Sequence, residues 1–211
     1  MCWNEEISFM TALMSTTIAI YIKNRNNKDD NWTGNFLLAI AGMQYIEFIA
    51  WLIINNKKDY KTLNIFLALI AVPFVLALQP IISYMGAYNN GYLPKYYGYF
   101  YMIYGIVVFL FLFMNRTGNE ITVVQNNKKT LFNEGYYLDW GHIKIHPLLS
   151  IFHTFVIIFP FLTQYKKLFV KLMLISGFFT KYIFAESASR WCLYTNIWSI
   201  IFLFNTKFNF S

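Results

Sequence analysis

The chain has little charge for its length and almost no cysteine. Only 13% of its 211 residues are charged, whereas 57% are hydrophobic, against about 25% charged in soluble domains. A water-soluble protein of this size has no interior large enough to hide so much apolar surface, which excludes a soluble globular fold. Two cysteines, Cys2 and Cys192, are too few for a disulfide framework and form no CxxC metal clip.

The positive charge is spread along the chain. The formal net charge is +7, but the basic residues lie mostly in short clusters between apolar runs, such as Lys57-Lys58 and Lys166-Lys167. This pattern is typical of loops beside lipid headgroups, where each base gains about 1 kcal/mol near an anionic surface. The sequence has no basic stripe with groove geometry, so we expect the lipid bilayer as partner and no nucleic acid.

Apolar runs close to 20 residues long dominate the chain, and about 20 helical residues cross a hydrocarbon core of roughly 30 Å. The sequence therefore predicts an all-α fold, a polytopic seven-transmembrane helix bundle that forms a single domain over residues 1–211. A six-helix count is the main alternative, because the first and last runs are short and carry polar residues. The predicted spans are residues 7–23, 33–54, 62–86, 96–114, 147–164, 167–185 and 190–206.

The one long connection covers residues 115–146. Its Ile121-Thr-Val-Val segment is followed by a polar stretch and a second apolar one, which predicts a small hairpin lying on the membrane surface. Pro73, Pro80 and Pro160 fall inside predicted spans, where they predict kinks that neighbouring helices stabilise. We expect Gln79, next to Pro80, to cap such a kink and not to join a pocket.

Helix parity brings several chemically interesting residues to one side of the membrane. With seven spans, the N-terminus and the connections after the second, fourth and sixth helices share one membrane face, which we call face A. Cys2, His142, His146, Glu186 and Cys192 all fall at face A. Because they share this face, Cys2 and Cys192 meet the minimal requirement for a disulfide; free thiols are the alternative.

Two ionisable residues lie inside the membrane in the half next to face A. Glu47 and His153 are both roughly 10 Å below that face at the helical rise per residue. A carboxylate at such depth costs on the order of 2.5–3.5 kcal/mol, so Glu47 is expected to face the bundle interior, with a partner or in its protonated form. Glu47 is the strongest functional candidate, and His153 is a candidate partner.

Helical spacing groups other polar residues with Glu47. Gln44, Glu47 and Trp51 share one face of the second helix, because spacings of three and four return to the same side. The first helix carries the stripe Ser8, Thr11 and Ser15, and the last carries Cys192, Asn196 and Ser199. Two interpretations remain open: a polar pocket near face A, and ordinary hydrogen bonding between membrane helices.

The three histidines suggest a metal alternative. His142 and His146 have the i, i+4 spacing that presents two nitrogens to one metal when the segment is helical. Together with His153 they form a candidate zinc site, although Pro147 interrupts the helical condition.

Several motifs along the chain resemble a known family. They are Met1-Cys2-Trp3 with Ser8, Gln44-x-x-Glu47-x-x-x-Trp51, Gln79-Pro80, Trp140-Gly-His142 and Glu186-Ser-x-x-x-Trp191-Cys192. Together they resemble an uncharacterised multi-pass membrane protein family of giant DNA viruses and some cellular genomes. The resemblance implies a seven-helix protein without an assigned activity, located in a host or virion membrane.

A fainter similarity is to the alkaline ceramidase-like membrane hydrolases, and it implies a zinc-dependent enzyme. The chain departs from that pattern, because its last predicted helix carries no paired histidines. The first hypothesis is therefore a polar pocket that binds or conducts a small ligand or ion, lined by Glu47, Gln44, Trp51, His153, Cys192, Ser8 and Glu186. The alternatives are a zinc-dependent hydrolase of a lipid amide or ester and a structural viral membrane protein.

Overall fold

The structure is a computed structural model. It describes residues 4–25, 27–56, 60–125, 136–141, 147–163, 196–197, 199–201 and 203. These residues are mostly helical, in agreement with the expected all-α class, apart from one two-stranded antiparallel sheet.

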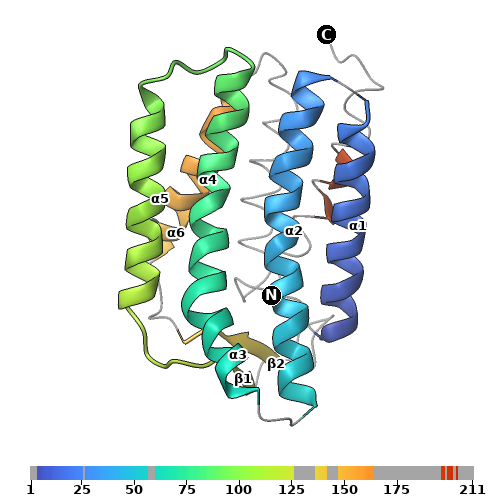
Figure 1. The fold of residues 1–211 in the computed structure, drawn as a ribbon, viewed down its shortest axis with the longest axis vertical. Helices are drawn as coiled ribbons and strands as arrows, with labels where there is room; N and C mark the ends of the chain where they lie inside the picture. The colour runs from blue at the N-terminus through green and yellow to red at the C-terminus, as the bar shows by residue number, and fades with distance from the viewer. Residues whose placement is uncertain are drawn as a thin grey trace.

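The described elements follow one another in the order shown in Figure 1. A π-helical turn, Leu67–Ala71, joins α3 to α4, so that Lys61–Asn89 is one continuous helix. The strands pair with Thr122 opposite Asp139. The elements are α1 (Glu5–Lys23), α2 (Lys28–Asn55), α3 (Lys61–Phe66), α4 (Val72–Asn89), α5 (Tyr97–Met114), β1 (Thr122–Gln125), β2 (Tyr136–Asp139) and α6 (Pro147–Leu162).

Three helices within the described residues are long and apolar enough to cross a membrane, namely Lys28–Asn55, Lys61–Asn89 and Tyr97–Met114. Large apolar side chains on α5 point outward, for example Ile103, which is 62% exposed. Outward-facing apolar surface of this extent is typical of contact with lipid. The helices therefore mark a membrane-associated protein.

Helices occupy the first five of the seven predicted spans. The sixth, 167–185, lies outside the described residues, as does much of the seventh. The helix α2 begins five residues before the predicted position 33, because Asn27 caps it by accepting a hydrogen bond from the N–H of Asp29. Such a polar first turn is stabilised by the cap and the helix dipole, which an apolar-run criterion does not register.

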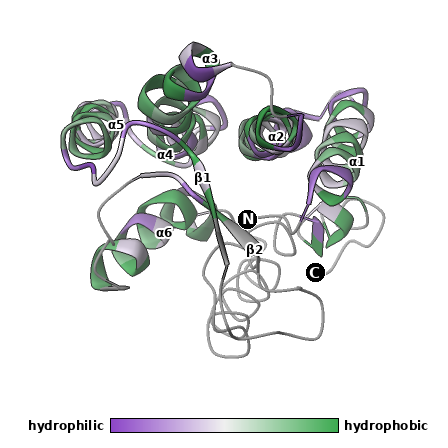
Figure 2. Ribbon diagram, turned by 90° about the horizontal axis from the view of Figure 1, so that it is seen from below, coloured by the Kyte–Doolittle hydropathy of each residue, from purple (hydrophilic) through white to green (hydrophobic). Residues whose placement is uncertain are grey.

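Neighbouring helices in the row α1, α2, α4 and α5 are antiparallel (Figure 1), and α6 lies outside this row, beside α4 and α5 (Figure 2). At one end of the bundle, Asn55 donates a hydrogen bond to the Glu5 carboxylate at 3.1 Å. The strands β1 and β2 lie across this same end (Figures 1 and 2). We call it the hairpin end; it corresponds to the predicted face A.

Two apolar clusters fill the interior at different heights. The cluster near the hairpin end includes Met43, Ala50 and Val72. The other includes Ile40, Tyr84 and Phe161. The helix α2 passes from one cluster to the other close to Gln44, so buried polar side chains occupy the level at which the clusters meet.

Candidate functional site

A buried polar layer lies where α1 packs against α2. Ser8, Ser15 and Gln44 have no exposed surface, and Glu47 is only 1% exposed. A hydrogen bond of 3.2 Å between the hydroxyls of Thr16 and Tyr45 sets the register. Since the two helices are antiparallel, this register places Ser15 at a height between those of Gln44 and Glu47, which are about one turn apart along α2.

Small residues on α1 allow this close packing. Its buried face repeats Ser8, Ala12, Ser15 and Ala19, and small residues let membrane helices approach closely. The buried faces of α1 and α2 thus carry polar side chains of the two predicted stripes. Neither Gln44 nor Glu47 is without an interaction partner, as expected for polar groups in an apolar interior.

The predicted last helix contributes one described contact to this layer. Ser199 has no exposed surface, and its hydroxyl donates a hydrogen bond to that of Ser15 at 3.3 Å. Trp51 is also buried and belongs to the apolar cluster next to the hairpin end. The layer thus has polar side chains from three predicted spans, with an aromatic residue on its hairpin side.

His153 lies elsewhere, on α6. Its Nδ1 forms a hydrogen bond of 2.9 Å with the hydroxyl of Tyr104 on α5, and the two rings stack at 25°. Its Nε2 is buried and has no hydrogen-bond partner among the described residues. The structure therefore pairs His153 with Tyr104 instead of Glu47.

The remaining predicted site residues lie outside the described residues: Cys2, His142, His146, Glu186 and Cys192. The candidate disulfide and two of the three candidate zinc ligands are among them. Within the described ranges, no three His, Cys, Asp or Glu side chains lie close enough together to hold a metal ion.

The π-helical turn has a free carbonyl that binds Arg116, a residue that the sequence analysis did not single out. In this turn, the N–H of Val72 donates to the carbonyl of Leu67, and the next residue, Pro73, has no N–H to give to Ala68. The Arg116 guanidinium donates to the Ala68 carbonyl instead, at 2.6 Å.

Arg116 also fastens its own loop. Its Nε donates to the Gly118 carbonyl at 2.9 Å and its Nη2 to the Trp140 carbonyl at 3.0 Å. Burial lowers the pKa of Arg116 from its ordinary value, yet an arginine side chain keeps its charge in a protein. One cation therefore ties both arms of the hairpin to the π-helical turn.

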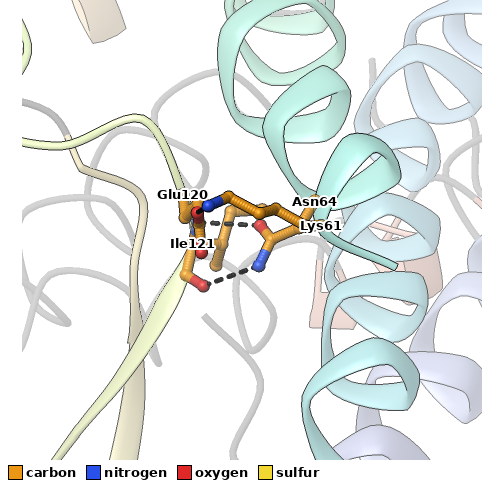
Figure 3. Close-up of polar contacts among 4 residues, drawn as sticks. All are labelled: Lys61, Asn64, Glu120 and Ile121. Carbon is orange, nitrogen blue, oxygen red and sulfur yellow. Dashed lines mark hydrogen bonds and ion pairs between the residues drawn. The ribbon is translucent and has the colours of Figure 1, made fainter. Parts of the chain in front are cut away.

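A second tether joins the hairpin to α3. The buried side chain of Asn64 accepts a hydrogen bond from the N–H of Ile121 at 2.8 Å and donates one to its carbonyl at 3.0 Å (Figure 3). Lys61 and Glu120 form an exposed ion pair at 3.6 Å beside it (Figure 3). The side chain of Asn64 thus pairs with Ile121 as a neighbouring β-strand would.

The hairpin, which the sequence predicted, packs against the end of the helix bundle. Ile121 and Leu138 are buried, at 2% and 0% exposure, in the same cluster as Leu67 and Val72. Apolar residues at alternate strand positions face the helices, because side chains alternate between the two faces of a strand. The hairpin therefore covers the end of the bundle that is nearest to Glu47.

A groove of about 390 Å³ separates α5 from α6. Aromatic side chains dominate its lining, among them Tyr97, Tyr101, Phe155 and Phe159. Its surface is apolar, and the Tyr104–His153 pair lies between the same two helices. The groove is a surface feature distinct from the polar layer around Glu47.

The chain matches no protein-family model, no curated protein and no solved structure. The fold and site therefore define a class only: a helical, membrane-associated protein with a buried polar layer beneath a docked hairpin.

Proposed function

We propose that the chain is a multi-pass integral membrane protein with seven spans, whose polar layer binds or conducts a small cation. The observation that supports this proposal is the burial of Glu47, at 1% exposure, within a helix that is long and apolar enough to span a membrane. Ionisable residues at such positions are costly and mark ion or substrate pathways in membrane proteins.

The chemistry of the layer favours a cation. Glu47 supplies the negative charge, and Gln44 and Ser15 add neutral oxygens of the kind that bind hard cations. A carboxylate attracts a cation and repels an anion, so the charge of Glu47 favours a cation as the ligand.

Flux through liposomes tests the proposal. The full-length protein is reconstituted with an imposed diffusion potential, and entry of Na⁺, K⁺ and H⁺ is followed with ion-sensitive dyes. We expect one of these cations to enter faster than in empty liposomes, and Glu47→Gln to abolish the increase. A matched control is Glu120→Gln, the same chemical change at an exposed position, which should keep the flux.

The competing interpretation is that the polar layer serves only helix association. It predicts that Glu47→Gln, which keeps a hydrogen-bonding side chain of the same shape, leaves every property unchanged. The proposal is therefore wrong if the wild-type protein neither transports nor binds any of the three cations, or if Glu47→Gln behaves as the wild type. Equilibrium binding of Na⁺ and K⁺, measured by calorimetry on the same preparation, covers the case of binding without conduction.

A further inference from the structure

A second group of polar side chains lies where α4 packs against α6. The Ser83 hydroxyl of α4 donates a hydrogen bond of 2.6 Å to the Ile157 carbonyl of α6. Both helices run antiparallel to α5, so they are parallel to each other (Figure 1). Four residues before this bonded pair, on the same helix faces, lie Gln79 and His153. They therefore lie at one height, one turn nearer the hairpin end.

Gln79 and His153 both have side-chain atoms without a hydrogen-bond partner in the described part of the chain. Gln79 has no exposed surface, and neither its Nε2 nor its Oε1 has a hydrogen-bond partner there. The Nε2 of His153 is also buried without one, while its Nδ1 is held by Tyr104. Burying an amide without hydrogen bonds in an apolar interior costs free energy. The unpaired Gln79 amide therefore indicates a further hydrogen-bonding group between the helices.

The three prolines inside helices each leave a backbone carbonyl without its usual N–H donor, and two of these carbonyls receive a side-chain donor instead. A proline inside a helix withholds an N–H from a carbonyl one turn earlier. The carbonyl associated with Pro73 receives Arg116, and that of Val156, four residues before Pro160, receives the hydroxyl of Tyr101 at 3.2 Å.

Pro80 frees the Leu76 carbonyl in the same way, but no described side chain donates to it. This carbonyl points along the helix towards Pro80, on the side where Gln79, Pro80 and Ser83 are all buried. Leu76 lies three residues before Gln79, about one turn away on α4, so a carbonyl freed by Pro80 is a further acceptor near the Gln79 amide.

We propose that Gln79, His153 and the Leu76 carbonyl form a binding site for a water molecule inside the bundle. The Gln79 amide both donates and accepts, the carbonyl only accepts, and His153 Nε2 does one or the other according to its tautomer. A cation would leave the amide N–H unpaired, and an anion would leave the carbonyl unpaired. Water donates and accepts, and a buried water needs two to four such partners.

The site goes beyond the proposed cation pathway and does not depend on it. Its members lie on α4 and α6, whereas Glu47 lies on α2. A bound water here satisfies the break that Pro80 makes in the long helix Lys61–Asn89, and it links α4 to α6. The water is thus a structural ligand at the centre of the membrane-spanning region.

Infrared spectroscopy of the reconstituted protein tests this site. A confined water gives a sharp O–H stretching band that shifts when the sample is equilibrated with H₂¹⁸O. We expect such a band in the wild type, its loss in Gln79→Met and in His153→Phe, and its retention in Tyr101→Phe. The last variant removes a hydrogen bond between α5 and α6, outside the proposed site.

Two outcomes would overturn the proposal. One is a wild-type spectrum with no isotope-sensitive sharp band, which needs no variant to fold. The other is a band that persists unchanged in both Gln79→Met and His153→Phe. Circular dichroism and a single elution peak establish that each variant is folded before its spectrum is compared.

Discussion

Asn64 offers the most quantitative test of how the hairpin is held on the bundle. Its side chain makes two hydrogen bonds to the backbone of Ile121, at 2.8 and 3.0 Å, at a buried position. Asn64→Leu keeps the volume but removes both bonds. It leaves the N–H and carbonyl of Ile121 facing an apolar side chain, where neither group finds a protein partner.

The expected cost follows from the two groups of Ile121 that lose their hydrogen bonds. Each buried group left unsatisfied costs about 1–3 kcal/mol, so Asn64→Leu should weaken hairpin docking by about 2–6 kcal/mol in total. Ile121, Leu138 and Trp140 still bury their apolar side chains, at roughly 1.5–3 kcal/mol each. The hairpin should therefore remain docked on average, but its undocked population should rise roughly 30- to 20,000-fold, since about 1.4 kcal/mol is a factor of ten.

Hydrogen exchange of a peptide covering residues 118–125 measures that population, because protected amides exchange through local opening. Exchange in Asn64→Leu should accelerate by the factor just given. The matched control is Lys61→Ala, which removes the neighbouring exposed ion pair. Such a pair is worth about 0–1 kcal/mol, so exchange should rise by no more than roughly fivefold. Equal acceleration in both variants would refute the reasoning.

Two further substitutions test helix packing and hairpin docking. Gly86→Ala places a methyl 1.8 Å from Cδ1 of Trp32, whose ring is stacked on Phe161 and has no room to move. The overlap should cost more than the roughly 1 kcal/mol that alanine gains in a helix and lower the thermal unfolding midpoint, whereas Gly42→Ala, with its nearest contact at 3.9 Å, should not lower it. Arg116→Lys keeps the charge but cannot span three carbonyls, so it should accelerate exchange over residues 118–125 about as much as Asn64→Leu; wild-type exchange would show that charge alone suffices.

The helices could be predicted from the sequence because in a membrane they are a nearly local property. A backbone in hydrocarbon must satisfy its own hydrogen bonds, so an apolar run of sufficient length is helical wherever it packs. The prediction of 96–114 agrees with α5, Tyr97–Met114, to within one residue at its start. The prediction for α2 missed its polar first turn, which Asn27 caps.

The burial of Ser15, Gln44 and Glu47 was also predictable, because helical period puts polar residues on one face and that face avoids lipid. The partner of His153 was not. Tyr104 is one aromatic residue among many in the sequence, and its bond to His153 depends on the rotation and height of α5 against α6. The sequence-based expectation of Glu47 as a partner used depth alone, which says nothing of lateral position.

The sequence by itself determined that this chain is helical, rich in lipid-facing surface, and polar at a few interior positions. Only the tertiary structure decided which polar groups meet. It pairs Arg116 with the Ala68 carbonyl of the π-helical turn and Asn64 with Ile121, and it leaves Gln79 without a partner among the described residues. The reason is physical. Local hydrogen bonding fixes where each helix lies along the chain, but the register between helices is set by small packing contacts far apart in the sequence, and a shift of one turn changes every partner.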